Sequence, residues 1–283
     1  MIDLKVWALG FGGTSRRLED MTESQLIGGV IGLATALRDR FDWSILTRAL
    51  TNTENALGSS GFDVSWCDGS PSTVIYAPPK WNGTTFYEDH NHFLGYDSGG
   101  GKTFDDAISG AAFKVAEHGL PLNTNFKVLY SETDVTTYRG LAHMVLPVDN
   151  VTPVLGGRTD QPTLYQSGVP GSIPASGGRY TGSFNTAYGF AQLYATPRIP
   201  TGYGLVYRPG ATFAADNGLS IRYRPSTGFG IRINEIPDYN TTFPVKEIDC
   251  EDEYGVSCGK NRYAGAVYEL VSGGTFANPT ISL

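Results

Sequence analysis

The chain has 283 residues, of which 17% are charged, and its formal net charge is −7. Its 36 glycines and 16 prolines make up about 18% of the residues, below the roughly 25–30% of low-complexity chains, so we expect a folded protein with one or two cores. Because the 28 acidic residues outnumber the 21 basic ones, the composition gives no support to nucleic-acid binding through phosphate neutralisation.

The cysteines and the apolar segments give no sign of export or of a membrane span. Cys67, Cys250 and Cys258 are odd in number and have no C-x-x-C spacing, which argues against a zinc knuckle and a disulfide framework and fits a reducing compartment. Residues 6–11 lack the positive flank of a signal peptide. Residues 26–37 are shorter than the roughly 20 apolar residues that a membrane helix needs.

The first helix is predicted at about residues 22–40. Residues 22–25 have the sequence of a capping box, and leucine and valine then recur at helical spacing. Three glycines lie inside this segment, and close packing by a neighbouring element is the simplest reason to tolerate them. A second, shorter helix is predicted at about 43–57. The apolar positions of the first helix are Leu26, Val30, Leu33 and Leu37.

A projecting β-hairpin is predicted over residues 68–95. Asn82-Gly83 tolerates the backbone of a tight turn, and strand-like runs at 74–76 and 85–88 flank it. We expect the hairpin to expose aromatic side chains and to pack on a neighbouring molecule. Its predicted contact residues are Trp81, Asn82, Gly83, Phe86 and Tyr87.

A further helix is predicted at 103–118. Thr103 is placed to cap it, with Asp105 and Asp106 in its first turn, and Gly119 and Pro121 follow its end. We expect its apolar face to pack against strands late in the chain. That face consists of Phe104, Ile108, Ala111, Ala112 and Val115.

The remaining sequence predicts short strands separated by Gly- and Pro-rich turns. Together with the helices, this order predicts an α+β fold. Residues 156–182, rich in Gly, Ser, Pro and Thr, are interpreted as a loop. The predicted strands cover residues 126–130, 143–148, 204–207, 219–223, 230–233, 245–251 and 264–271.

Two groups of residues resemble binding motifs. Gly99–Thr103 precedes a helix, but the spacing of a phosphate-binding loop fails because position 96 is Tyr, so a hinge is favoured. His90 and His92 share a face if they lie on a strand, and Asp89 or Glu88 could add a third metal ligand. We favour hydrogen-bonded structural histidines over a metal, since the other histidines, His118 and His143, stand in unrelated contexts.

Three acidic residues alternate along the strand predicted at 245–251. Glu247, Asp249 and Glu251 should share one face, where like charges repel. Two interpretations stand equal: a solvated edge that resists stray strand pairing, or a surface that meets basic residues of a neighbouring subunit, with Arg222, Arg224 or Arg232 as partners. No G-x-S-x-G or Cys–His motif is present, and we predict no catalytic residue, no cofactor and no metal.

The order of these elements resembles the major capsid proteins of tailed bacteriophages, whose fold is shared with encapsulin shells. In that family an N-terminal arm precedes an extended hairpin loop, a spine helix, an axial domain and the last strands of a peripheral domain. The matching text is residues 47–55, the Asn82-Gly83 hairpin, His90–Tyr96, the spine-like 103–118, and the segments 253–256 and 262–267.

The resemblance implies a division of the chain. Residues 1–67 would form the N-terminal arm and helices, and 68–102 the extended hairpin loop. Residues 103–150 would form the peripheral domain with the spine helix, 151–239 the axial domain, and 240–283 the return strands of the peripheral domain.

The resemblance also implies a structural, non-enzymatic function. The chain would assemble with itself into hexamers and pentamers of an icosahedral virion capsid around double-stranded DNA, in the host cytoplasm. Scaffolding, portal and decoration proteins are possible partners, without sequence-specific nucleic-acid or membrane binding. Two alternatives stay open: a non-viral nanocompartment shell, and a β-rich metal-dependent enzyme that uses His90 and His92.

Overall fold

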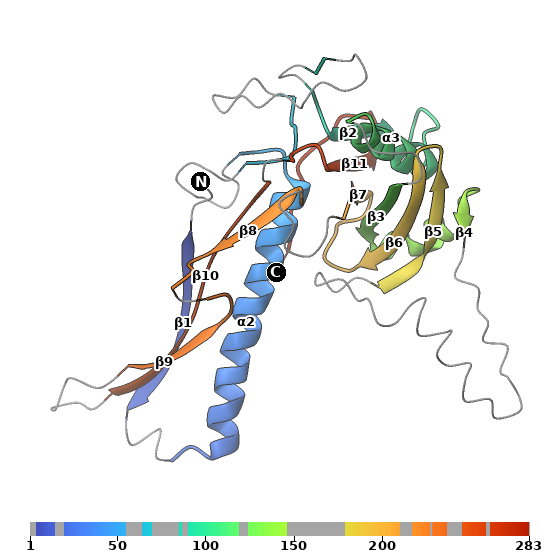
Figure 1. Cartoon of the computed structure of the whole chain (residues 1–283). Helices are drawn as coiled ribbons and strands as arrows, with labels where there is room; N and C mark the ends of the chain where they lie inside the picture. Colours follow the sequence, from blue (N-terminus) through green and yellow to red (C-terminus); the bar gives the residue numbers. More distant parts are fainter. Residues whose placement is uncertain are drawn as a thin grey trace, which may run out of the picture.

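Helices and two β-sheets make up the described part of the chain, as the predicted α+β class requires (Figure 1). One sheet has four strands and carries a long helix, and the other has seven strands and carries shorter helices. The computed structural model describes residues 4–14, 20–54, 64–69, 85–86, 90–118, 124–145, 179–209, 217–226, 228–236, 245–258 and 261–282.

The four-stranded sheet is built around β10 (Val245–Cys258). This strand pairs antiparallel with β1 (Lys5–Thr14), β8 (Leu219–Tyr223) and β9 (Arg232–Ile236). Strands β8, β9 and β10 were predicted, although β10 extends beyond residue 251 and β9 begins two residues later than expected. Strand β1 was not predicted.

The long helix α2 (Glu23–Leu50) runs along one face of this sheet (Figure 1). The prediction of two helices was wrong: no Gly or Pro separates residues 40 and 43, so the helix continues through them. Its capping box is confirmed, because Thr22 and Gln25 bond each other reciprocally. No helix among the described residues has the length and apolar character needed to cross a bilayer.

The seven-stranded sheet has the order β2-β11-β7-β3-β6-β5-β4. Strands β5 and β6 were not predicted, and residues 179–182 of the expected loop belong to β5; residues 146–178 lie outside the described residues. The predicted strand at 143–148 is described only as the short β4. The strands are β2 (Phe93–Asp97), β3 (Thr124–Ser131), β4 (Met144–Val145), β5 (Arg179–Thr186), β6 (Gly189–Thr196), β7 (Tyr203–Tyr207) and β11 (Gly265–Val271).

Both faces of the seven-stranded sheet are covered, because alternate residues of its strands enter two different apolar cores. Val128, Leu193 and Val206 pack with α3 (Phe104–Ala116) in the first core. Their neighbours Leu129 and Tyr194 pack with the end of α2 in the second. The period of two residues that defines a strand therefore assigns successive side chains to opposite cores.

Helix α3 confirms the prediction for residues 103–118. Phe104, Ile108 and Val115 are buried, and the helix packs on β11 and β7. At its start the Asp106 carboxylate accepts a hydrogen bond of 3.0 Å from the Thr103 amide, which lowers the pKa of Asp106. Two short helical segments, η1 (Glu132–Asp134) and α4 (Val135–Arg139), follow β3.

The two sheets group the chain differently from the predicted domains. α3, assigned to the peripheral domain, packs on the same sheet as β5, β6 and β7, which were assigned to the axial domain. The four-stranded sheet instead joins β1 from the predicted arm to β8, β9 and β10. The predicted boundary at residues 150 and 151 therefore does not separate the two sheets.

Ile108→Ala tests the position of α3. This side chain is fully buried, so its truncation should lower the free energy of unfolding by about 2–5 kcal/mol. Asp106→Ala, at a half-exposed cap position, should cost about 1 kcal/mol. Urea unfolding of the unassembled subunit measures both, and equal losses would contradict the packing described for α3.

Candidate functional site

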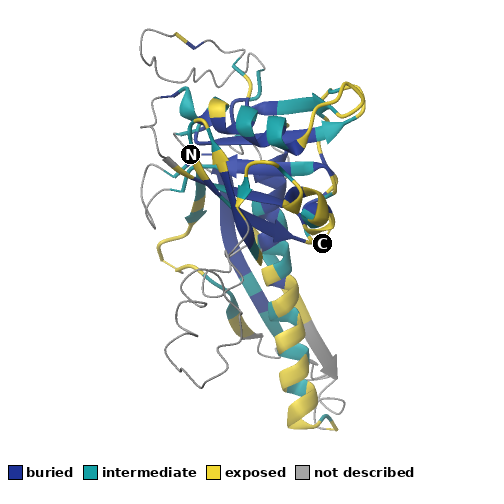
Figure 2. Cartoon of the chain, turned by 90° about the vertical axis from the view of Figure 1, so that its right-hand side faces the viewer, coloured by how far each residue is buried: buried dark blue, intermediate teal, exposed yellow. Residues whose placement is uncertain are grey.

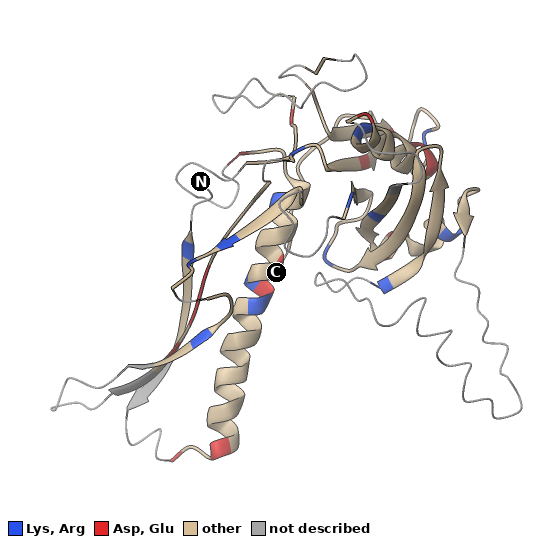
Figure 3. Ribbon diagram, in the orientation of Figure 1, with Lys and Arg blue, Asp and Glu red and all other residues tan. Residues whose placement is uncertain are grey.

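The first half of α2 is an exposed helix surface with almost no charge. Residues 24–37 contain no charged side chain (Figure 3), and none of residues 23–36 is buried. Every residue from 46 to 50 is buried, so the helix is embedded at one end and uncovered at the other (Figure 2). A helix of a lone soluble protein normally presents a polar face to water, and this segment does not.

Large exposed apolar side chains gather on the same sheet and helix. Ile27 and Ile31 on α2 are 49% and 59% exposed, respectively. Among the described residues, eleven large apolar side chains are exposed, and eight of them lie on or beside α2 and the four-stranded sheet. They are Val6, Leu9, Ile27, Ile31, Ile221, Tyr223, Phe229 and Ile233.

Two of the three glycines of α2 are not covered by the described part of the subunit. A Cβ atom built on Gly28 or Gly32 would meet no heavy atom within 4 Å. The close packing by a neighbouring element that the sequence predicts is therefore not found at these two positions among the described residues. Together with Ile27 and Ile31, they leave a smooth, uncharged surface that a second molecule can approach closely.

The acidic strand residues lie on β10. Cys250 on an alternate position is buried, but Glu253, which shares the face of Asp249 and Glu251, is buried as well, so burial does not separate the two faces. Arg232, proposed as a partner from a neighbouring subunit, is the cross-strand partner of Glu251 in the same chain, with Nη2 3.5 Å from Oε2. Nη2 of Arg224 lies 2.7 Å from Oε1 of Glu253 in the same chain. A contact of Asp249 or Glu247 across a subunit boundary stays a prediction.

Most of the predicted hairpin lies outside the described residues, including Trp81, Asn82, Gly83 and Tyr87. The bridge between Asp68 and Asn91 brings the two ends of the segment together, as a hairpin requires. Phe86 is only 7% exposed, so its predicted exposure was wrong. Its ring packs instead against His118, at 4.2 Å between centroids, and against His90.

The structure brings His90 and His92 together with His118 and Glu117 at the end of α3. The statement that His118 stands in an unrelated context was therefore wrong; His143 lies elsewhere, beside Asp105. The predicted ligands Asp89 and Glu88 lie outside the described residues.

Burial keeps two of these rings neutral. It lowers the pKa of His92 well below its ordinary value and that of His118 to about 4. Burial by itself would raise the pKa of the Glu117 carboxyl, but contacts with His90 and Lys114 hold that pKa below the usual value.

No protein-family model matches the sequence, and no curated protein matches it either. A solved structure from Mycobacterium phage Patience matches 98% of this chain and 72% of its own, with a TM-score of 0.63 and 19% identity. The asymmetric unit of the bacteriophage PhiM1 mature capsid matches 95% of this chain and 71% of its own, with a TM-score of 0.51 and 14% identity.

The chain has the tailed-phage capsid fold. At these identities the likeness establishes the arrangement of the elements and leaves the function to be argued separately. The holo-SrpI encapsulin of Synechococcus elongatus PCC 7942 matches 98% of this chain and 77% of its own at 11% identity, with a TM-score of 0.48. Within the capsid fold, α2 is the longest described helix, with 28 residues against 13 for α3.

Glu251→Gln tests the cross-strand ion pair. Because both side chains are about 30% exposed, the variant should lose about 1 kcal/mol or less in free energy of unfolding, and this loss should shrink as salt is added. Asp249→Asn, opposite Asn234, is the matched control and should change stability less. Urea unfolding at low and high salt measures both, and a loss that is independent of salt would argue against the pair.

Proposed function

We propose that this chain is a structural shell subunit, a tailed-phage major capsid protein that assembles with itself into capsomers and an icosahedral virion capsid around double-stranded DNA. The observation that carries the proposal is the uncovered, uncharged half of α2. In the capsid fold this surface has a natural occupant, a second copy of the same chain. The proposed role is non-catalytic.

The charge distribution supports a protein partner. Residues 24–37 of α2, which include Ile27 and Ile31, contain no Lys or Arg that would attract a phosphate backbone, and the whole chain is acidic. Low charge and exposed aliphatic side chains are typical of the centre of a protein–protein interface. We therefore place a subunit contact, rather than the packaged genome, against α2.

We also propose new positions for the capsid domains. The four-stranded sheet with α2 fits the peripheral domain, and α2 fits the spine helix better than α3 does, because it is twice as long and runs along the sheet. The seven-stranded sheet with α3 fits the axial domain. The segment between Asp68 and Asn91 stays a proposed subunit contact, but with α2 as the spine helix it follows the spine, whereas the extended loop of the family precedes it.

We favour the viral role over a nanocompartment because the solved structures that match with TM-scores of 0.63 and 0.51 both come from phages. Purified particles distinguish the two roles. Nuclease-resistant DNA inside particles from infected cells supports a virion capsid, whereas an enclosed protein cargo would support a nanocompartment.

Ile31→Asp tests the proposed contact on α2. A carboxylate at this position would be desolvated when a neighbouring subunit covers it. The association constant of the subunits should therefore fall about tenfold or more. The free energy of unfolding of the isolated subunit should change by about 1 kcal/mol or less, because Ile31 is exposed. Ile31→Leu, which keeps the apolar surface, is the matched control. Sedimentation velocity measures assembly, and normal assembly of the Asp variant would contradict the proposal.

Deletion of residues 78–84 tests the proposed contact of the segment between Asp68 and Asn91. The deletion spares Phe86, whose buried ring belongs to the subunit core. We expect a folded subunit, with circular dichroism and Tm close to those of the unmodified chain, that no longer forms particles in light scattering. Unchanged assembly would remove this segment from the list of subunit contacts.

A further inference from the structure

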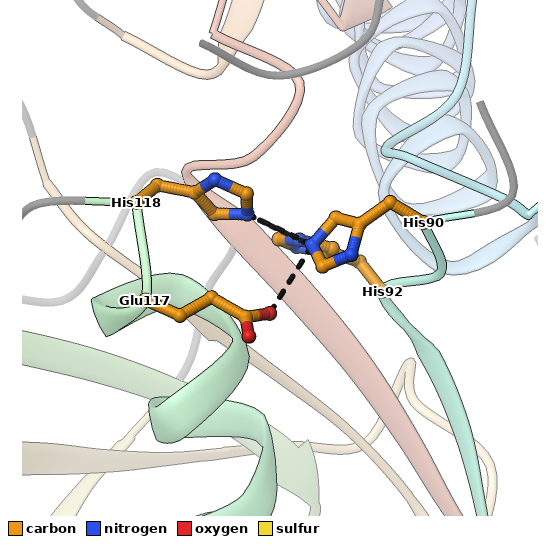
Figure 4. Close-up of side chains that lie close together, drawn as sticks. All are labelled: His90, His92, Glu117 and His118. Atoms are coloured by element: carbon orange, nitrogen blue, oxygen red, sulfur yellow. Dashed lines mark hydrogen bonds and ion pairs between the residues drawn. The ribbon is translucent and has the colours of Figure 1, made fainter. Parts of the chain in front are cut away.

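Three histidine rings meet at the end of α3 with their Nε2 atoms facing one another. Nε2 of His90 lies 2.9 Å from Nε2 of His118, and Nε2 of His92 lies 3.0 Å from each of the other two. The Glu117 carboxylate closes the group, with Oε1 3.1 Å from Nε2 of His90 (Figure 4). The four side chains therefore direct their metal-binding atoms toward one small volume, within 4.8 Å of one another.

Hydrogen bonds alone do not account for this arrangement. The Gly265 carbonyl oxygen lies 2.7 Å from Nδ1 of His92, and because a carbonyl only accepts, Nδ1 carries the ring proton. Neutral His92 then has only a lone pair at Nε2. The Nε2 of His90 or His118 can donate one proton to one acceptor. Whichever of them is protonated, at least one of the three close pairs brings two lone pairs or two protons together.

A metal ion resolves this conflict, since all three lone pairs can point to the same cation. Zinc–nitrogen bonds of about 2.0–2.1 Å place tetrahedral ligand atoms about 3.3–3.4 Å apart, so the three nitrogens need to separate by only about 0.3–0.5 Å. We propose that His90, His92, His118 and Glu117 bind a structural zinc ion.

The donor set favours zinc over the common hard cations. Calcium and magnesium take oxygen ligands, whereas imidazole suits zinc and other late first-row metals. Four protein ligands complete a tetrahedral shell, and His92 and His118 are buried, as in a closed structural site. The metal-dependent enzyme considered from the sequence would instead need an open position for water or substrate.

Surrounding contacts hold the ligands in place. The Gly265 carbonyl fixes the tautomer of His92, and Nζ of Lys114 lies 3.1 Å from Oε1 of Glu117. The rings of Phe86 and Tyr263 pack on His118, with centroids 4.2 and 5.0 Å away. These contacts orient the rings and limit the access of water.

The site would join two segments that are distant in the sequence. His90 and His92 flank Asn91, which bridges to Asp68, whereas Glu117 and His118 follow the last residue of α3. The His92 amide also donates to the Cys67 carbonyl at 2.7 Å. Zinc would therefore fasten both ends of the segment between Asp68 and Asn91 to α3. This holds for the single folded subunit and does not depend on shell assembly.

Metal analysis of the full-length purified chain tests the proposal. We expect about one zinc per chain after dialysis, and less than about a tenth of that in His118→Ala. His143→Ala, which removes an exposed histidine outside the cluster, should keep the zinc. A strong chelator should lower the Tm of the unmodified chain and of His143→Ala, and zinc should restore it.

Cobalt gives a readout that does not depend on whether the His118 variant folds. Added to the metal-depleted unmodified chain, Co²⁺ should produce the visible absorption of a tetrahedral site and saturate at about one equivalent. The proposal is overturned if the chain holds no zinc and gives no such spectrum with excess Co²⁺, or if His118→Ala retains zinc as well as His143→Ala does.

Discussion

The burial of the last turns of α2 between the two sheets is the interaction on which the rest of the structure depends. Leu46 and Leu50 pack with Trp66 and with the face of the seven-stranded sheet opposite α3. Burying each leucine contributes about 1.5–3 kcal/mol. Fully buried Arg48 donates hydrogen bonds to the carbonyls of Thr51 and Thr53, which lie beyond the helix end. With this end fixed, the orientation of the whole helix is fixed.

The opposite end of α2 follows from the same constraint. A rigid helix of 28 residues is about 42 Å long, more than the seven-stranded sheet can cover, so its first half extends along the four-stranded sheet. There β1 and β10 contact only part of its circumference, and Ile27 and Ile31 stay uncovered. Embedding one end of the helix thus leaves its other end uncovered, where we propose the contact with another copy of the chain.

Local patterns in the sequence predicted α3 and the strands β3, β7, β8 and β11, because each is defined by its own periodicity. Strand β1 escaped prediction because its partner β10 lies at the other end of the chain and its three glycines weaken the local signal. The histidine cluster was only half found. Spacing joins His90 to His92, but only the tertiary fold brings His118 to them. The buried position of Phe86 has the same origin, since the rings that cover it are assembled by the fold.

The central claim is that, in an assembled shell, other copies of this chain cover the exposed half of α2. Electron microscopy of the purified, unmodified protein tests it most directly. The account predicts closed shells or ring-shaped capsomers in which neighbouring subunits cover the first half of α2. A monodisperse monomer at high protein concentration, or particles in which that half of the helix faces solvent, would contradict it.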